Sequence, residues 1–282
     1  MAAYRTGWQV NVEPRWGATP IGSIRHSDVS GWVADLASRR GAQTVRTAVG
    51  VLRGILADAV ADRMLAANPA AGVKLPKRPP ARHVYLTAGQ LDRLADECGQ
   101  YGSLVLLLGA VGPRFGEAAA LRVADIDWLH RRVTLTRNAV TVNGRVVVGT
   151  LKANANRAVP LPAFVFDALA ETARGKGRDD LLWASSGGGY LMPPHGRMWL
   201  AGAVARCQAG DPTFPRVTAH DLRHTAASLA IHAGAHPKVV QRMLGHTSAA
   251  MTLDVYADLF DSDLDAVAEN VAKMWSRQVN SH

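Results

Sequence analysis

Hydrophobic residues between positions 28 and 66 recur at the spacing of two amphipathic helices. The first is expected to start at Asp28, its N-cap, and to end before Gly41. The second is expected to close at Asn68-Pro69, because the residue before a proline avoids helical geometry. Their apolar faces consist of Val29, Trp32, Val33 and Leu36 in the first helix and Val45, Ala48, Val49, Leu52, Leu56 and Ala59 in the second. The pattern predicts a small helical domain over residues 1–75.

A basic, proline-rich segment, KLPKRPPARH, follows at residues 74–83. Its three prolines are incompatible with a helix interior or a central strand, so we expect an extended linker over residues 76–86. Thr87 and Gln90 then have the spacing of a capping box ahead of further apolar residues. This indicates that a second domain, residues 87–282, begins with a helix.

The hydrophobic period changes within the second domain. Residues 104–111 form a continuous apolar run, which predicts a buried helix. Between Val133 and Leu161 the segments RVTLT, RVVVGTLK and RAVPL have the character of short strands, with turns at Asn143-Gly144 and at residues 154–156. The remainder is expected to be helical. The sequence therefore predicts a mainly α fold with a small antiparallel β-sheet, in two domains.

Composition excludes several classes of protein. The chain of 282 residues is 48% hydrophobic and 20% charged, which is typical of a globular protein and not of a disordered one. Its two cysteines, Cys98 and Cys207, cannot form a disulfide framework or a zinc site of three or four thiolates, which fits a reducing compartment. We find no signal peptide, membrane span or phosphate-binding loop of the type G-x-x-x-x-G-K-[ST]. We therefore expect a cytoplasmic protein that does not use nucleotide hydrolysis.

The charge balance favours a polyanionic partner. Lys and Arg number 32 against 23 Asp and Glu, giving a formal charge of +9 and a pI near 10.1. The linker contributes candidate DNA-backbone contacts at Lys74, Lys77, Arg78 and Arg82. We expect a clamp of two basic domains around a DNA duplex.

The C-terminal end differs from the rest in charge. Residues 251–282 hold two basic and six acidic side chains, so this segment should avoid DNA. Apolar residues recur there at helical spacing, namely Leu264, Val267, Ala268, Val271 and Trp275. We expect this tail, from about residue 258 to 282, to dock on its own domain or on a neighbouring subunit.

The segment TAHDLRHTAASLA, residues 218–230, contains the densest group of candidate catalytic residues. Thr218 and Asp221 form a capping-box pattern, so a helix should start at Ala219 with its free backbone N–H groups available to an anion. His220 and Arg223 are three residues apart and therefore share one face of that first turn. A guanidinium and an imidazole at a helix N-terminus are suited to binding phosphate.

Three further features extend this pattern. Leu244-Gly245-His246 follows a short predicted helix, and Tyr256 lies ten residues beyond it. The stretch GPRFGE at residues 112–117 has the spacing G-x-R-x-x-E. Lys152 lies beside a predicted turn in a chain with 26 Arg and six Lys. Since an ammonium can give up a proton and a guanidinium cannot, Lys152 is a candidate general acid.

This combination of motifs resembles the tyrosine recombinases, the phage-integrase family. The resemblance implies a helical core-DNA-binding domain with a SAM-like fold at residues 1–75 and a mixed α/β catalytic domain at residues 87–282. It also implies site-specific recombination through a 3′-phosphotyrosine intermediate and a free 5′ hydroxyl. The implied catalytic residues are Arg114, Lys152, His220, Arg223, His246 and Tyr256, with Glu117 supporting the site.

The family chemistry assigns a role to each of these groups. The two arginines would offset charge on the phosphate, Tyr256 would attack phosphorus, and Lys152 would protonate the leaving 5′ oxygen. His220 would take the proton from Tyr256 or bond the phosphate, and His246 would donate a hydrogen bond to it. One phosphoester replaces another, so neither ATP, a metal nor another cofactor is required.

The resemblance also implies partners. These are double-stranded DNA at core attachment sites, used in phage integration or excision, further copies of the chain in a tetramer joined through the C-terminal tail, and a host DNA-bending protein or a directionality factor. It places the protein with the nucleoid of a bacterial host. About 27 residues precede the first clear helix, so we expect the arm-site-binding domain of many phage integrases to be absent.

Other functions remain open from sequence alone. Residues 220–224 resemble a two-histidine zinc motif, although Asp221 stands where that motif needs glutamate. Residues 224–246 have the pattern of a helix-turn-helix regulator without catalysis. A type IB topoisomerase would share the phosphotyrosine chemistry without exchanging DNA partners.

Simpler structural roles also remain open for single residues. Arg114 and Glu117 have the spacing of a local ion pair, while His220 and Arg223 fit a solvated helix face. Lys152 fits a solvated hairpin cation. The other tyrosines, which we expect to pack or to contact the DNA backbone, are Tyr4, Tyr85, Tyr101 and Tyr190.

Overall fold

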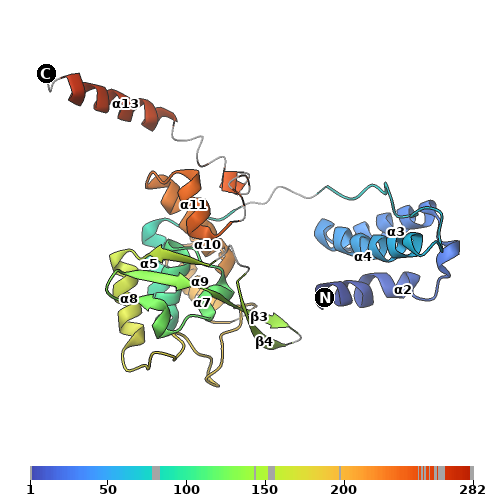
Figure 1. The fold of residues 1–282 in the computed structure, drawn as a ribbon, viewed down its shortest axis with the longest axis horizontal. Helices are drawn as coiled ribbons and strands as arrows, with labels where there is room; N and C mark the ends of the chain where they lie inside the picture. The colour runs from blue at the N-terminus through green and yellow to red at the C-terminus, as the bar shows by residue number, and fades with distance from the viewer. Residues whose placement is uncertain are drawn as a thin grey trace. The chain divides into compact units, whose positions relative to one another are not determined.

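The computed structural model describes residues 2–77, 83–142, 144–151, 156–196, 198–246 and 264–279, together with residues 248, 250, 252, 253, 255, 256 and 259. The chain forms two compact units, Met1–Arg82 and His83–His282 (Figure 1). Their division falls within the basic segment expected to be a linker, of which residues 78–82 lie outside the described part.

The first unit is helical throughout. A continuous helical segment opens it, formed by α1 (Ala2–Gly7), the π-helical turn η1 (Trp8–Val12) and α2 (Glu13–Trp16). The short 3-10 turn η2 (Ile21–Ser23) leads to α3 (His26–Arg39) and α4 (Ala42–Ala61). The opening helices were not predicted, because Gly7 and Pro14 weaken the local helical signal. Packing stabilises them: Val12 is fully buried, and the rings of Trp16 and Trp32 meet edge to face at 5.8 Å.

Helices α3 and α4 bury all the apolar positions predicted for them, and α3 ends before Gly41 as expected, but the predicted start of α3 and the predicted end of α4 were wrong. Asp28 is not the N-cap of α3; it lies at the third helical position, where its carboxylate accepts the backbone N–H of Arg25 at 3.1 Å. Helix α4 ends at Ala61, well before Asn68. The Asn68 side-chain amide instead donates to the Arg53 carbonyl at 2.9 Å. This bond connects the loop that follows α4 to the helix itself.

The second unit begins with the predicted capping box. Thr87 Oγ1 accepts the N–H of Gln90 at 3.2 Å, and Gln90 Oε1 accepts the N–H of Thr87 at 3.0 Å. The helices of this unit are α5 (Ala88–Glu97), α6 (Gly102–Ala110), α7 (Phe115–Ala119), α8 (Ala163–Ala173), α9 (Trp199–Gly210), α10 (Ala219–His232), α11 (Pro237–Leu244) and α13 (Leu264–Val279), with 3-10 turns η3 (Gly99–Tyr101) and η4 (Val123–Asp125).

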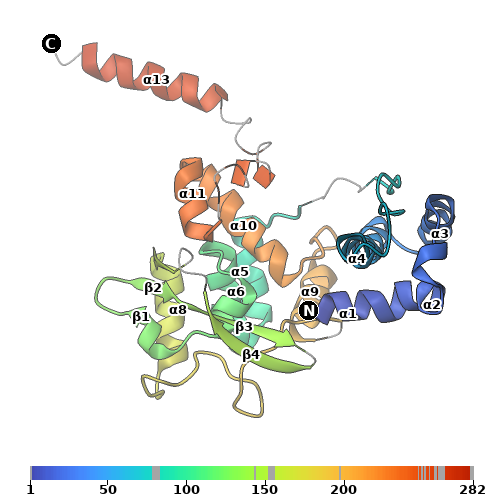
Figure 2. The same cartoon turned by 45° about the vertical axis from the view of Figure 1, so that its right-hand side comes forward.

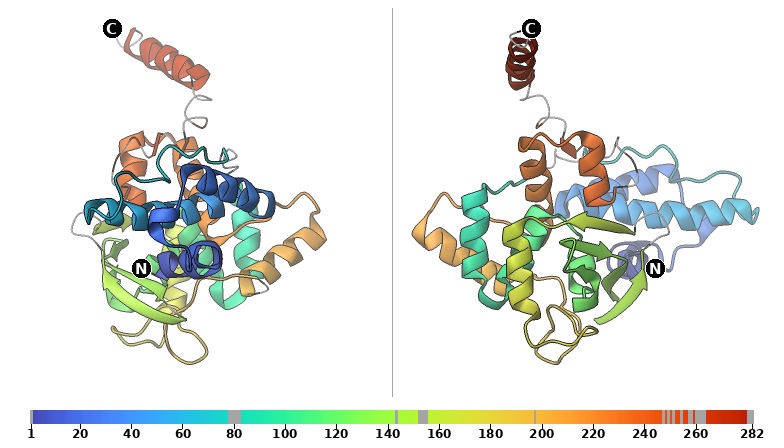
Figure 3. Two further views of the ribbon diagram at one scale, coloured as in Figure 1. Left: turned by 90° about the vertical axis from the view of Figure 1, so that its right-hand side faces the viewer. Right: turned by 60° about the vertical axis from the view of Figure 1, so that its left-hand side comes forward.

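Helix α6 is the centre of this unit. The predicted apolar run falls on α6, where Leu104, Val105, Leu107 and Leu108 are fully buried. It packs against α5, α8 and α10. Figures 2 and 3 show α10 and α11, in orange, above the light-green strands. Helix α6 therefore packs directly against α10, which carries the H-x-x-R motif, and α10 packs against α11, which leads into the L-G-H motif.

The strands form two small antiparallel sheets where one was predicted. Strands β1 (Ile126–Asp127), β2 (Arg132–Leu135) and β5 (Arg157–Pro160) pair in the order β1-β2-β5. Strands β3 (Arg137–Val142) and β4 (Arg145–Thr150) form a separate hairpin, whose turn contains Gly144 at φ +76°. The three predicted strand segments appear as β2, β4 and β5. The remaining two strands were missed because β1 is two residues long and β3 carries Arg137 and Asn138 at its start.

Two further regions complete this unit. The expectation of helix downstream of β5 was wrong for residues 174–198, whose described part is irregular, with an isolated bridge between Ala184 and Tyr190. The acidic tail forms α13, on which Val271, Met274 and Trp275 are exposed. Among the helices of the described residues, none combines the length and apolar character needed to cross a membrane.

Candidate functional site

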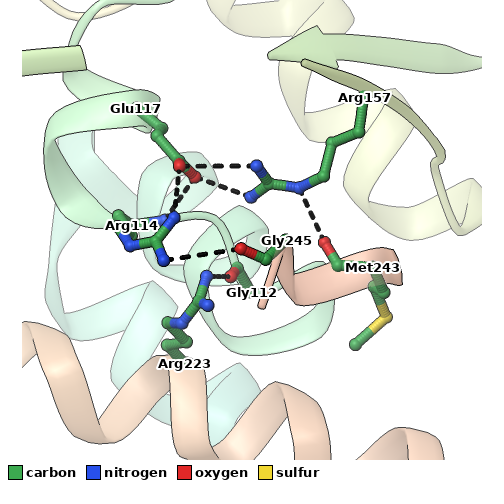
Figure 4. A network of polar contacts seen from close by, with 7 residues as sticks. All are labelled: Gly112, Arg114, Glu117, Arg157, Arg223, Met243 and Gly245. Atoms are coloured by element: carbon green, nitrogen blue, oxygen red, sulfur yellow. Dashed lines mark hydrogen bonds and ion pairs between the residues drawn. The ribbon is translucent and has the colours of Figure 1, made fainter. Parts of the chain in front are cut away.

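The candidate site lies where four elements of the second unit meet. Figure 4 shows the guanidinium groups of Arg114, Arg157 and Arg223 directed into one region, between the start of α7, strand β5, the first turns of α10 and the end of α11. We call the contacts of Arg114, Glu117 and Arg157 the arginine–glutamate network.

Glu117 is the centre of that network. Its side chain has no solvent exposure. One carboxylate oxygen, Oε2, accepts the backbone N–H of Arg114 at 2.8 Å, and Oε1 accepts Arg114 Nη1 at 2.9 Å (Figure 4). Burial acts to raise the pKa of this carboxyl, but the hydrogen bond and charge of Arg157 and the hydrogen bonds of Arg114 lower it below its ordinary value. Arg114 and Glu117 do form the local ion pair that their spacing allows, yet the pair is part of a larger buried network.

Arg157 is the network member that sequence reasoning missed. It donates from Nη2 to Glu117 Oε2 at 2.6 Å and from Nε to the carbonyl of Met243 at 2.9 Å, with 9% of its side chain exposed. Val159, two residues on, belongs to the buried core. A basic residue on the same face of a strand as a core residue is the signal that could have revealed Arg157.

Arg223 is buried within the first turns of α10. The predicted capping box is present there, with the N–H of Thr218 donating to Asp221 Oδ2 at 2.8 Å, and the helix begins at Ala219 as expected. Arg223 is 4% exposed, and its Nη1 donates to the carbonyl of Gly112 at 2.6 Å, so it does not lie on a solvated face. Burial, with the charge of Arg114, lowers its pKa to about 10.

His220 is exposed at the start of the same helix. Its ring lies 4.7 Å from that of His224, one helical turn further on. Partial desolvation and the Arg223 charge lower the pKa of His220, which favours the neutral imidazole. A neutral imidazole is the form that can accept a proton.

His246 follows a left-handed turn at the end of α11. Gly245 has φ +69°, and a Cβ there would lie 2.7 Å from Arg157 Nη1, so both the backbone conformation and the space require glycine. The His246 ring is fixed by a 2.9 Å hydrogen bond between Nδ1 and Thr252 Oγ1. Burial, with the charges of Arg223, Arg114 and Arg157, lowers its pKa to about 4.

Tyr256 is buried at 1% exposure in a small apolar cluster with Val240 and Leu244 of α11. Its hydroxyl lies 2.8 Å from His224 Nδ1. Burial raises the pKa of Tyr256 to about 12, and burial, with the nearby His83 charge, lowers that of His224 to about 4. The His83 ring lies 4.2 Å from that of His224.

The contacts of His224 and His83 with the tyrosine region were not predicted. His224 lies four residues after His220, so its place on the same helix face was a usable signal. Tyr85, expected only to pack or contact DNA, is half-buried against the same cluster as Tyr256.

The structure does not place every predicted site residue at this site. Lys152, Arg78 and Arg82 lie outside the described residues, while Lys74 and Lys77 are exposed in the first unit. The described part of the chain holds no group of three or more His, Cys, Asp or Glu placed to bind a metal ion. Among these residues, no third zinc ligand therefore lies beside the two histidines of residues 220–224.

Helices α10 and α11 are joined by a turn that contains Gly234 at φ +83°, as the helix-turn-helix pattern requires. However, most of α10, from Leu222 to Ser228, is buried in the unit that carries the arginine–glutamate network. A pure DNA-reading module would not need the buried Arg223 and the 9% exposed Arg157 directed, with Arg114, into one region. This set of groups is instead suited to phosphoryl transfer, in which fixed cations offset charge on the phosphate.

Comparison with known proteins agrees with this chemistry. Residues 85–263 match the Phage integrase family. The integrase of Mycobacterium phage D29 is 29% identical over 261 residues, covering 89% of this chain and 67% of its own. Tyrosine recombinase XerC of Mycobacterium tuberculosis is 32% identical over 253 residues, covering 83% of this chain and 80% of its own.

Solved structures share the fold. The Tn1549 transposon integrase in complex with a circular intermediate DNA superimposes with a TM-score of 0.79 at 19% identity, covering 93% of this chain and 92% of that one. A lambda integrase tetramer bound to a Holliday junction superimposes with a TM-score of 0.64 at 16% identity, covering 87% and 70%.

Fold and sequence together define a DNA recombinase of the tyrosine class. The chain belongs to the phage integrase family. It is a site-specific recombinase that catalyses DNA strand exchange, so the family resemblance and the predicted fold class are confirmed.

The buried histidines make stability depend on pH. His224 and His246 have pKa values lowered from 6.5 to about 4, so the unfolded chain binds protons there that the folded chain excludes. We expect stability to be greatest above pH 6.5 and to fall as the pH drops toward 4, measured as the urea midpoint. His224→Gln keeps a hydrogen-bonding group but does not titrate. The unfolding free energy of this variant should therefore depend less steeply on pH, because unfolding takes up fewer protons, by up to about one. Equal slopes would contradict a buried, neutral His224.

Proposed function

We propose that this recombinase cuts DNA at core attachment sites of a phage or similar element, with Tyr256 as the nucleophile and Arg114, Arg223, His220, His246 and Lys152 as the other catalytic residues. The observation that carries this proposal is the convergence of Arg114, Arg223 and His246, where burial and the charges of both arginines lower the pKa of His246, together with the charge of Arg223 acting on Tyr256. These residues come from three separate parts of the sequence, and Arg223 is bonded to the Gly112 carbonyl, two residues before Arg114.

The two arginines provide a fixed positive field for one phosphodiester. Arg114 has 45% of its side chain exposed, so its guanidinium is accessible to DNA while Glu117 holds it. Arg223 is fixed by the Gly112 carbonyl. Because both cations are oriented before DNA binds, little reorganisation is needed as negative charge builds on the non-bridging oxygens. His246, neutral near pH 7, donates a hydrogen bond to the same group.

The reaction balances without an external energy source. The phenolic oxygen of Tyr256 forms a bond to phosphorus while the bond from phosphorus to the 5′ oxygen breaks. The phenolic proton passes to His220, and Lys152 supplies a proton to the 5′ oxygen. The 5′ hydroxyl of a second DNA then attacks the phosphotyrosine and reverses these transfers, which reseals the strand.

His224 adds a step before cleavage. A phenol with a pKa of about 12 is a weak nucleophile, and its hydroxyl is engaged by His224. Cleavage therefore requires the Tyr256 hydroxyl to break its hydrogen bond with His224 and to approach the phosphate. The charge of Arg223 lowers the pKa of Tyr256 and so favours the phenolate.

The helical first unit and the basic linker serve DNA binding in this proposal. The net charge of +9 favours the DNA backbone, and Lys74, Lys77, Arg78 and Arg82 contact phosphates. A host DNA-bending protein or a directionality factor assists, and the protein acts on the nucleoid in the bacterial cytoplasm.

Four copies are proposed to assemble on recombining sites through the acidic tail, as the lambda integrase does as a tetramer on a Holliday junction. Helix α13 exposes Val271, Met274 and Trp275, an apolar surface suited to burial against another copy. Removal of residues 260–282 should preserve binding to a half-site and abolish tetramers on paired full sites, measured by analytical ultracentrifugation. Tetramers formed by the shortened chain would contradict this role of the tail.

The nucleophile is tested by trapping the covalent intermediate. On a core-site duplex nicked near the cleavage point, the wild-type protein should form a DNA adduct that survives denaturant, because the short 5′ product diffuses away. Tyr256→Phe lacks the attacking oxygen, so it should form no adduct while retaining its DNA affinity in a gel-shift measurement. An adduct with the variant would refute the assignment.

A sulfur-substituted DNA distinguishes the role of the general acid from that of the nucleophile. Sulfur in place of the bridging 5′ oxygen leaves as a thiolate, which needs no proton. Lys152→Ala should therefore lose adduct formation on ordinary DNA and recover it on the sulfur-containing DNA, whereas Tyr256→Phe should fail on both. Failure of Lys152→Ala to recover would exclude Lys152 as the proton donor.

A further inference from the structure

We propose that Arg157 is a positioning residue for strand cleavage: it joins Glu117, the partner of Arg114, to the end of α11, and so sets Arg114 and His246 to meet the same phosphate. This inference rests on the proposed function, in which Arg114 and His246 contact the scissile phosphate.

Arg157 holds the carboxylate on which Arg114 depends. Glu117 is fully buried and receives Arg157 Nη2 at 2.6 Å, a shorter contact than the 2.9 Å from Arg114 Nη1. With Arg157 present, two cations offset one buried anion, and the carboxylate is fixed from both sides (Figure 4). The orientation of Arg114 therefore depends on a residue 43 positions further along the chain.

The same guanidinium fixes the corner that carries His246. Arg157 Nε donates to the Met243 carbonyl at 2.9 Å, within the last turn of α11. Arg157 also fills the space beside Gly245, where a Cβ would lie 2.9 Å from its Cζ. Arg114 approaches the same corner, with Nη2 3.5 Å from the Gly245 carbonyl.

Arg157 itself is fixed by strand pairing. It is the first residue of β5 and is paired in register with Leu135 of β2, which is 1% exposed. Its side chain is 9% exposed, whereas that of Arg114 is 45% exposed. Arg157 therefore acts through Glu117 and the α11 corner, and Arg114 is the group presented to DNA.

The test separates DNA binding from the covalent step. Adduct formation is followed in a single turnover on the nicked core-site duplex, and affinity is measured by gel shift. Arg157→Met should slow adduct formation about 10²-fold, the order of effect of misplacing a reacting group by about 1 Å, with affinity little changed. Arg157→Lys should be intermediate, because an ammonium keeps a charge beside Glu117 but lacks the fork that also reaches Met243. Arg206→Met, which removes the ion pair between Arg206 of α9 and Glu97 of α5, is the control and should cleave at the wild-type rate.

A neutral substrate distinguishes positioning from a general loss of structure. In a methylphosphonate, a methyl group replaces one non-bridging oxygen, so less charge must be offset by Arg114. The Arg157→Met defect should shrink at least tenfold on this DNA, as the defect of Arg114→Ala should. A defect of equal size on both substrates, or a wild-type rate on ordinary DNA, would overturn the inference.

Two further outcomes are informative. If Arg157→Met does not fold, as judged by circular dichroism, Arg157→Lys decides, and a wild-type rate for that folded variant would overturn the inference. Failure of the wild-type protein to form an adduct would overturn the proposed function instead, so the two failures are distinguishable.

Discussion

A buried carboxylate constrains the whole candidate site. Glu117 has no solvent contact, and an ionised group in such a place is tolerated only when cations and hydrogen bonds compensate it. Compensation comes from the backbone and guanidinium of Arg114 and from Arg157. Because these groups belong to the start of α7 and to β5, the single anion fixes the relative positions of a helix and a sheet. Arg114, the arginine proposed to contact DNA, is oriented by this arrangement.

The electrostatics of the site are matched to an anionic guest. Arg114 and Arg157 both contribute to lowering the pKa of Arg223, which means that the cations repel one another when no further anion is present. A phosphodiester between Arg114 and Arg223 would relieve that repulsion. The imidazoles of His220 and His246 are biased toward the neutral form by burial and by the same cations, which suits them to accept or donate single protons near neutral pH.

Features with a short-range cause could be predicted from sequence. The capping boxes at Thr87 and Thr218 depend on residues three positions apart, and both are present as expected. The buried faces of α3 and α4 follow from their periodicity. Asp28 shows the limit of this reasoning: an acidic residue near a helix start fits the N-cap and the third position almost equally well, and the structure uses the second option.

Contacts between distant residues could not be predicted in the same way. The bond from Arg223 to Gly112 spans 111 positions, that from Arg157 to Glu117 spans 40, and that between His224 and Tyr256 spans 32. Motif spacing selected Arg114, Arg223, His246 and Tyr256 as candidates, with Glu117 as a supporting residue, but it did not indicate which other side chains contact them. Sequence position could at most have marked Arg157 and His224 as candidates, and their contacts with Glu117 and Tyr256 are shown by the tertiary structure.

Arg114, held by Glu117, and Arg223, held by the Gly112 carbonyl, are proposed to receive the phosphate that Tyr256 attacks. The most direct measurement is a crystal structure of the covalent complex trapped on a nicked core-site DNA. We expect the phosphate on Tyr256 Oη, with its non-bridging oxygens bonded to Arg114 and Arg223 while Glu117 remains between Arg114 and Arg157. A linkage to another residue, or a phosphate bound away from both arginines, would contradict this account.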